Sequence, residues 1–381
     1  MAKKRGNNEG SIYKRKNGAW RAQVTLDGQR LSYSAKDKTD AQAWLRKMQD
    51  EIDDGLRYES TQLTLGQFME DWLITVQPTL RHNTHRQYKQ VTEQHILPVL
   101  GQHKIRELTA AQIQQLYNQL ITIGRGLRTV RYVHQVLHRS LAHAVKLGII
   151  GRNPAKAVIP PKPEPKEMQY LDEAQTQQLL FVAQASNDRF YALYHLAITT
   201  GMRMGELLGL KWEDLDRDQA TLHIRRQLTR LQGIGLRLRP PKTKAAFRRI
   251  DLGQQSLNVL KEHRERQFQD MVAAGDRWEE NNLVFASTKG TFINPSNLRR
   301  EFKPLLQRAG LPKIRFHDLR HTAASLMLNN SIPLIVVSRR LGHAQPSITL
   351  DVYGHLIPSK QQEAAALMDE LLTPIQVELP T

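Results

Sequence analysis

A stretch near the C-terminal end of the chain concentrates side chains that could do chemistry. Between Ile314 and Tyr353 it holds these cationic and nucleophilic residues: His317, Arg320, His321, Arg340, His343 and Tyr353. A hydrophobic core has no use for so many groups that carry charge or protons. Their density predicts a binding site for an anion.

Spacing within this stretch indicates how the groups could meet. His317 and Arg320 are three residues apart and share one helical face. Gly342 ends an apolar helical pattern, so His343 projects from a loop edge. Tyr353 follows ten residues later. Each residue alone is more often a surface or packing residue, and only their conjunction indicates a site.

Further cations come from upstream. Gly201 breaks one helical pattern before another begins, which puts Arg203 near a helix N-terminus, where free backbone N–H groups favour anions. A Pro-Pro turn carries Lys242, and Lys244 lies two residues on. This turn belongs to a basic hairpin: between Thr221 and Ile250 there are nine Lys or Arg and no acid.

The amino-acid composition limits which partners and which kinds of site the protein can have. Lys and Arg outnumber Asp and Glu by 55 to 37, a formal charge of +18, which favours a polyanion such as a phosphate backbone. The chain has no cysteine, which excludes disulfides, thiol nucleophiles and thiolate zinc sites. No apolar run reaches the roughly 20 residues that span a membrane, and MAKKRGNNEG lacks the apolar stretch of a secretory signal. We expect a cytoplasmic protein without membrane partners.

The N-terminal region reads as a small basic sheet. Strands are predicted from Gly10 to Gly18, at Trp20–Leu26 and from Gln29 to Ser34, and a helix from Ala41 to about Asp54, with Ala43, Trp44, Leu45 and Met48 buried. Residues 1–38 carry ten Lys or Arg against three acids. The strands could lie in a DNA major groove, or present only a solvated basic face. The candidate DNA contacts here are Lys14, Arg15, Lys16 and Arg21.

A helical block follows. Helices are predicted behind Thr64, from Asn83 to Ile96, from Thr109 to Ile121 and from Arg128 to Leu147, and no strand. From Leu63 to Pro165 there are thirteen Lys or Arg against five acids. Cations on helix faces without acidic partners favour phosphate contact. The candidates in this block are Arg86, Lys89, Arg128, Arg131 and Arg139. A proline-rich linker, 153–165, ends it.

The last block begins near Met168. One helix is predicted from Asp172 through Phe181 and Tyr191 to Thr199. Further helices are predicted at 254–273, 295–309 and 360–372, and strands at 221–224, 227–229, 248–252 and 283–286.

The order TGMR-x-GEL, hairpin lysine, HDLRH, LGH and then tyrosine resembles the tyrosine recombinase family, specifically the integrases of phages and integrative elements. The resemblance implies a multidomain α+β fold. Residues 1–60 would form an arm-type DNA-binding domain with a three-stranded sheet and one helix. Residues 61–165 would form an all-α, SAM-like core-binding domain. Residues 166–381 would form a mainly α catalytic domain with a small antiparallel sheet.

The resemblance also assigns roles. Arg203 and Arg320 become phosphate-clamping arginines, Lys242 the hairpin lysine, and Tyr353 the nucleophile. His317 and His343 become the active-site histidines. Glu206 corresponds to the acid that supports the first arginine. Lys244 remains an alternative to Lys242, or a DNA contact.

The chemistry needs these residue types independently of any family. Guanidinium forks hold the non-bridging oxygens of a phosphodiester bidentately, which suits Arg203 and Arg320. A tyrosine with a pKa of about 10 needs its proton accepted, and His317 is the first candidate. Lys242 can protonate the leaving 5′-oxygen, and His343 can donate a hydrogen bond. The product is a 3′-phosphotyrosine, and a 5′-hydroxyl from another duplex can attack it and reverse the step. No metal or nucleotide cofactor is needed.

Further partners follow from the resemblance. It implies double-stranded DNA with core and arm sites, a homotetramer on two duplexes, and an accessory DNA-bending or directionality factor, in a bacterial cytoplasm and associated with the nucleoid. The segment 361–372 has apolar residues at helical spacing: Ala364, Ala365, Leu367, Met368 and Leu371. It would close its own domain or, as in the resembled family, pack on a neighbouring protomer.

Three rival functions remain. A metal-dependent hydrolase could use His317, His321, His343 or His355. His317 and His321 are, however, separated by Asp-Leu-Arg, without the Glu of an HExxH site, and an Arg between the ligands would repel a cation. A non-catalytic DNA-binding protein leaves the Arg203, Arg320 and Tyr353 conjunction unexplained. A type IB topoisomerase-like relaxation of DNA would share the chemistry.

Overall fold

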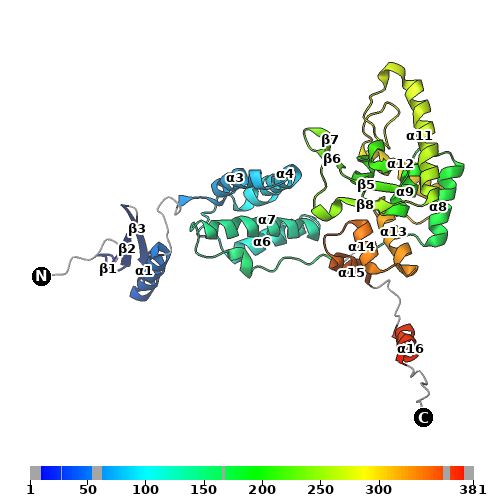
Figure 1. The fold of residues 1–381 in the computed structure, drawn as a ribbon. Coiled ribbons are helices and arrows are strands. Elements are labelled where there is room, and N and C mark those ends of the chain that lie inside the picture. The colour runs from blue at the N-terminus through cyan, green and yellow to red at the C-terminus, as the bar shows by residue number, and fades with distance from the viewer. Residues whose placement is uncertain (1–9, 27, 54–61, 165–167, 355–360, 373–381) are drawn as a thin grey trace, which may run out of the picture. The chain divides into compact units, whose positions relative to one another are not determined.

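The computed structural model divides the chain into two compact units, Met1–Pro165 and Lys166–Thr381 (Figure 1). The structure describes all residues except 1–9, 27, 54–61, 165–167, 355–360 and 373–381. Both ends of the chain, residues 1–9 and 373–381, and residues 355–360 therefore lie outside the described part. The finer division at residues 60 and 61 stays a prediction.

The N-terminal sheet has the order β1-β2-β3 and is antiparallel throughout. Its elements are β1 (Ser11–Lys14), β2 (Trp20–Leu26), β3 (Gln29–Ala35) and α1 (Lys38–Asp53). Side chains of β2 alternate, so Ala22 and Val24 face the buried side of the sheet. Ala41, Leu45 and Met48 of α1 complete this core at helical spacing. The prediction that Ala43 is buried was wrong, because it lies off this stripe.

The following region is helical, as predicted. Its elements are α3 (Leu65–Val76), α4 (His82–Val91), a π-helical turn (Thr92–Ile96), α5 (Leu97–Leu100), α6 (Ala110–Thr122) and α7 (Leu127–Lys146). Thr64 and Thr109 cap α3 and α6, each in a reciprocal capping box. The second predicted helix does not end before Pro98, because the π-helical turn carries the chain on into α5.

One of the candidate DNA contacts of this region has an acidic partner, contrary to expectation. Lys89 Nζ lies 3.7 Å from Glu93 Oε1, one helical turn on. Arg139 donates a hydrogen bond of 3.0 Å to Tyr88 Oη, so it is engaged with the protein as well. Arg86, Arg128 and Arg131 are exposed.

The C-terminal unit is built around α9, which is buried on all sides. The single helix predicted from Asp172 to Thr199 is two helices, α8 (Glu173–Ala185) and α9 (Tyr191–Thr200). A turn separates them, with Asn187 at a φ of 48°. The last turn of α9 packs against α13 (Asp318–Asn329), so two segments far apart in sequence lie side by side.

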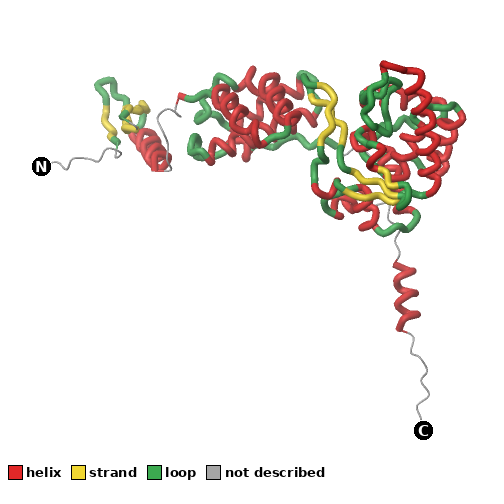
Figure 2. The backbone as a smooth tube through the Cα atoms, turned by 45° about the horizontal axis from the view of Figure 1, so that its top comes forward, coloured by secondary structure: helices red, strands yellow, loops and turns green. Residues whose placement is uncertain are grey.

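The strands of this unit form two small antiparallel groups (Figure 2). The first has the order β4-β5-β8, and β6 and β7 form a separate hairpin between β5 and β8. These strands are β4 (Leu215–Asp216), β5 (Thr221–Ile224), β6 (Gln227–Leu231), β7 (Gly235–Arg239) and β8 (Arg248–Asp251). The strand predicted at 283–286 is absent, and Leu283 and Ala286 make only isolated bridges.

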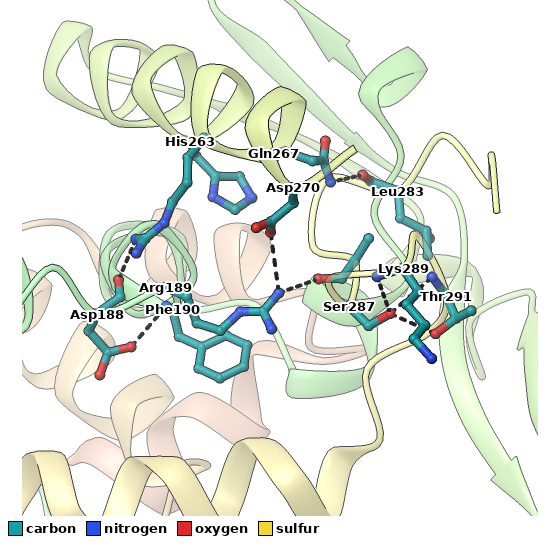
Figure 3. A network of polar contacts seen from close by, with 12 residues as sticks. Asp188, Arg189, Phe190, His263, Gln267, Asp270, Leu283, Ser287, Lys289 and Thr291 are labelled. Carbon is teal, nitrogen blue, oxygen red and sulfur yellow. Dashed lines mark hydrogen bonds and ion pairs between the residues drawn. The ribbon is translucent and has the colours of Figure 1, made fainter. Parts of the chain in front are cut away.

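A polar network holds α11 (Gln254–Ala274) to the turn before α9 (Figure 3). Arg189 donates to the carbonyl oxygen of Ala286 at 3.1 Å and lies 3.7 Å from Asp270 of α11. His263, also on α11, lies 2.8 Å from the carbonyl oxygen of Val284. These bonds replace the ladder that a strand at 283–286 would have supplied.

The remaining helices are α10 (Met204–Leu208), α12 (Pro295–Arg308), α14 (Leu334–Leu341), α15 (Pro346–Tyr353) and α16 (Gln361–Leu372). On α16, Leu367, Met368 and Leu371 are exposed, and the side chain of Ala364 lies outside the described part. Within the described residues, no helix has the length and apolar character to cross a membrane.

Candidate active site

Arg203 is placed by a sharp break between two helices. Gly201 ends α9 with a φ of 65°, and a Cβ there would collide with Leu341 of α14. The chain then restarts as α10 with Arg203 at its N-cap. Arg203 is therefore near a helix N-terminus, as predicted, and its side chain remains 37% exposed.

Glu206 joins two arginines beneath this position. Its carboxylate accepts hydrogen bonds of 2.9 Å from Arg203 Nη1 and 2.9 Å from Arg248 Nη2. Burial opposes ionisation of Glu206, but the ion pairs with Arg248 and Arg203 outweigh it and lower its pKa. Glu206 therefore stays an anion and orients both guanidinium groups.

Arg248 was missed by the sequence analysis, which placed it only in a returning strand. Its side chain is 7% exposed and also donates to the carbonyl oxygens of Arg340 and Ala246, at 2.7 and 3.0 Å. The alternation of side chains along β8 could have indicated that Arg248 points inward, because Arg248 and buried Ile250 share one face of the strand. An arginine on the inward face of a strand needs a buried anion.

Arg320 is almost fully buried and incompletely bonded. Nη1 donates to the carbonyl oxygen of Gly201 at 2.7 Å, whereas Nη2 has no hydrogen-bond partner among the described residues. Burial and the nearby Arg203 lower the pKa of Arg320 to about 9. A buried guanidinium with a free N–H and cationic neighbours is costly unless an anion joins it.

His343 stands at the end of α14. Gly342 ends that helix with a φ of 71°, and a Cβ there would meet the Arg248 guanidinium at 2.8 Å. Nδ1 of His343 lies 2.7 Å from Thr349 Oγ1. Burial and Arg320 lower the pKa of His343 to about 4. A neutral His343 that accepts from Thr349 carries its proton on Nε2 and can donate there.

Tyr353 is the last residue of α15 and is 1% exposed. Its ring packs in an apolar cluster with Leu328 and Val337. Burial raises its pKa to about 12, although Arg320 opposes the shift. The hydroxyl lies 2.7 Å from Nδ1 of His321. The nucleophile candidate is thus held inside the same group of cations.

His321, and not His317, contacts the tyrosine. His317 is exposed at the start of α13, and its ring packs edge-on against that of His321 at 5.3 Å between centroids. Desolvation of the ring and the nearby Arg320 lower the pKa of His317. We expected His317 to accept the tyrosine proton, but the hydrogen bond recorded for the Tyr353 hydroxyl among the described residues is with His321. The sequence analysis named His321 only as a possible metal ligand, although HDLRH places it one turn from His317.

Several other predicted residues are mostly exposed. Lys242 and Lys244 are exposed in the connection between β7 and β8. Lys14, Arg15 and Lys16 are exposed, whereas Arg21 is half-buried and donates to Ser32 Oγ at 2.7 Å. Among the residues that the structure describes, no three His, Asp or Glu side chains gather closely enough to hold a metal ion.

The arrangement places donors that can bind an anion beside a tyrosine hydroxyl that could act as a nucleophile. Arg203 and Arg320 supply guanidinium donors, His343 supplies an imidazole, and Tyr353 supplies a hydroxyl against a hydrogen-bond acceptor. Such a set can bind a phosphodiester and attack its phosphorus.

Two family models match the chain. One, described as "Phage integrase family", matches residues 169–360. The other, described as "Phage integrase, N-terminal SAM-like domain", matches residues 64–121.

Curated relatives match nearly the whole chain. A "Tyrosine recombinase XerC-like" protein of Caldanaerobacter subterraneus is 33% identical over 365 residues, which are 90% of this chain and 92% of the relative. The "ICEBs1 integrase" of Bacillus subtilis is 26% identical, over 95% of this chain and 100% of the relative.

Solved structures share the fold. The Tn1549 transposon integrase in complex with a circular intermediate DNA has a TM-score of 0.67 at 20% identity, covering 81% of this chain and 99% of that one. A lambda integrase dimer bound to a COC′ core site has a TM-score of 0.58 at 18% identity, covering 99% and 100%. The predicted multidomain α+β fold is confirmed by this likeness.

Proposed function

The chain belongs to the phage integrase family and is a site-specific recombinase that breaks and rejoins DNA, and we propose that Tyr353 is its nucleophile. One observation carries this proposal. The hydroxyl of Tyr353 is close enough to the buried Arg320 for its charge to oppose the rise in the pKa of Tyr353, and Nη2 of Arg320 has no hydrogen-bond partner within the described part of the chain. A phosphate bound to that donor would sit beside the hydroxyl.

The geometry supports the following division of work. Arg203 and Arg320 bind the non-bridging oxygens of the scissile phosphate, and His343 donates a further hydrogen bond from Nε2. Glu206 holds Arg203 in place. His317, exposed beside Arg320, contacts the same phosphate.

Attack by Tyr353 forms a bond from its oxygen to phosphorus and releases the 5′-oxygen, which takes a proton from Lys242. The product is a 3′-phosphotyrosine with a free 5′-hydroxyl. The ester keeps the energy of the phosphodiester, so a 5′-hydroxyl from another duplex can reverse the step. The reaction assigned to these residues needs no metal or nucleotide cofactor.

We further propose that recombination integrates or excises a mobile element in a bacterial cytoplasm, at the nucleoid. Core and arm sites on double-stranded DNA, a homotetramer and an accessory bending or directionality factor complete this assembly. A lambda integrase structure of the same fold is a tetramer bound to a Holliday junction, with a TM-score of 0.56. The exposed apolar residues of α16, among them Leu367 and Leu371, suit a contact with a neighbouring protomer.

A nicked suicide substrate tests the nucleophile. The core site is first mapped by nuclease footprinting on DNA that flanks the gene. The wild-type protein should form an SDS-resistant adduct with a nicked core site, and peptide mapping should find the DNA on Tyr353. Tyr353→Phe should bind the same DNA and form no adduct. An adduct in the Tyr353→Phe variant would refute the assignment.

A second arm separates recombination from relaxation. Two DNA molecules that each carry the site should recombine, whereas a topoisomerase-like activity would only relax one supercoiled circle. Arg203→Ala and Arg320→Ala should keep most DNA binding and lose cleavage. Equal loss of binding and cleavage would make these arginines ordinary DNA contacts.

A further inference from the structure

The contact between Tyr353 and His321 has no counterpart in the mechanism described so far. Nδ1 of His321 lies 2.7 Å from Tyr353 Oη, within the range of a strong hydrogen bond. From this contact we infer that His321 is the base that accepts the tyrosine proton during strand cleavage. The inference rests on the proposed function, since it takes Tyr353 as the nucleophile.

Tyr353 needs a base within the protein. Its side chain is 1% exposed, so solvent has little access to the hydroxyl. Burial also raises its pKa to about 12, which makes spontaneous ionisation at neutral pH rare. Among the described residues, the hydrogen bond recorded for this hydroxyl is the one with His321.

His321 is neutral and ready to accept. Burial lowers its pKa to about 4, and the nearby His317, Arg315 and Arg320 add to this shift. With the proton of the neutral ring on Nε2, Tyr353 donates its hydroxyl hydrogen to Nδ1. The hydrogen bond therefore points in the direction of the proton transfer.

Asp318 offers a partner for the charge that this transfer creates. Its Oδ1 lies 4.0 Å from Nε2 of His321, and its side chain is 2% exposed. The carboxylate is held by Arg315, whose Nη2 lies 2.6 Å from the same oxygen. Among the groups facing His321, Asp318 is the one that raises its pKa. Nucleophile, imidazole and carboxylate thus follow one another, as in other activated nucleophiles.

The step balances without another reactant. The O–H bond of Tyr353 breaks, and its proton moves to Nδ1 of His321. The electron pair of the tyrosine oxygen forms the new bond to phosphorus. The bond from phosphorus to the 5′-oxygen breaks, and that oxygen takes its proton from a separate acid. When the reaction reverses, imidazolium returns the proton to the departing tyrosine oxygen.

Two variants separate proton transfer from positioning. His321→Asn keeps an acceptor near the position of Nδ1 but cannot take a proton at neutral pH, whereas His321→Ala removes both. We expect both variants to bind the core site and to form the Tyr353 adduct on the suicide substrate roughly 10²–10⁴-fold more slowly. Their rates should rise about tenfold per pH unit between pH 6 and 9, because hydroxide replaces the base, while the wild-type rate stays nearly flat.

A substrate with sulfur in place of the bridging 5′-oxygen separates two proton transfers: the one from Tyr353 to His321 and the one from Lys242 to the leaving group. A thiolate leaves without protonation, so the sulfur substrate should rescue Lys242→Ala and leave His321→Asn slow. His317→Asn changes the neighbouring imidazole: loss of its phosphate contact should slow cleavage by the same factor at every pH and leave the shape of the pH profile as in the wild type. Added imidazole should partly restore His321→Ala.

The outcomes distinguish the two proposals. An absent adduct with the wild-type protein overturns the proposed function itself. A wild-type adduct together with a His321→Asn rate near the wild-type rate overturns only the role of His321. A slow His321→Asn variant with an unchanged pH profile also overturns it, since that result reports positioning alone. Melting temperature and footprinting of each variant show whether it is folded and binds DNA.

Discussion

Arg248 Nη2 lies 2.9 Å from Glu206 Oε2, and both side chains are nearly inaccessible to solvent. This buried ion pair ties β8 to α10, whose N-cap is Arg203. Arg248 also bonds the carbonyl oxygen of Arg340, at the end of α14. The strand β8, the start of α10 and the end of α14 thus meet at one guanidinium group.

Removal of Arg248 should therefore affect stability and cleavage together. Arg248→Ala leaves Glu206 buried with only Arg203 as partner, and breaking a buried pair costs roughly 3–5 kcal/mol. We expect a matching loss in the free energy of unfolding, measured with urea, and a slower adduct. Arg249→Ala, on the exposed face of the same strand, is the control and should change the free energy by less than about 0.5 kcal/mol. Similar losses in both variants would contradict the central place of Arg248.

Gly342 should tolerate no side chain. Gly342→Ala combines a left-handed φ of 71° with a Cβ at 2.8 Å from the Arg248 guanidinium. Gly310→Ala is a matched control, since its φ is 65° and nothing lies within 4 Å of the added Cβ. The control should lose about 1 kcal/mol of stability from backbone strain, and Gly342→Ala roughly 1–3 kcal/mol more. Only Gly342→Ala should slow cleavage. Equal losses of stability would mean that Arg248 moves aside freely.

Acid should destabilise the C-terminal unit through its buried histidines. The folded pKa values of His321 and His343 are about 4, below the ordinary value of 6.5. Unfolding therefore binds protons, so the stability that these groups contribute is complete above pH 6.5 and is lost as pH falls towards 4. Each contributes at most about 1.4 kcal/mol per pH unit to that slope. Urea unfolding at several pH values should show a shallower slope for His321→Asn. An unchanged slope would mean that the pKa of His321 is the same in the folded and unfolded states.

The exposed arginines of α7 should contribute to DNA affinity through phosphates. Arg128→Gln and Arg131→Gln should each weaken binding across sequences and reduce the slope of log K against log salt by about 0.9. Arg277→Gln, in the short 3-10 turn after α11, is the control for a lost surface charge and should leave that slope unchanged. Fluorescence anisotropy with a labelled core site at several salt concentrations measures the slope. Equal effects of all three substitutions would indicate a general effect of net charge.

Local structure near the site followed from residue types and spacing alone. The helix restart at Arg203 and the helix end at Gly342 were both predicted, and each depends on a glycine whose conformation is a local property of the chain. These features need no knowledge of distant residues.

Other local predictions failed where tertiary contacts decide. The turn that separates α8 from α9 is held by bonds from Arg266 to the carbonyl oxygens of Asn187 and Asp188, from a helix far along the chain. The segment 283–286 gives its carbonyl oxygens to side chains of α11 and so forms no ladder. Hydrophobic patterns cannot reveal such long-range hydrogen bonds.

The sequence by itself determined which chemistry is available, because only certain residue types can bind a phosphodiester, attack it and move its protons. Tertiary structure decided which of these groups meet. It put His321 against Tyr353, although His317 is the histidine that shares a helical face with Arg320, because Tyr353 of α15 packs against α13 beside His321. Tertiary structure also buried the ion pair between Arg248 and Glu206. Contacts between segments depend on packing over the whole unit, and sequence spacing alone cannot predict them.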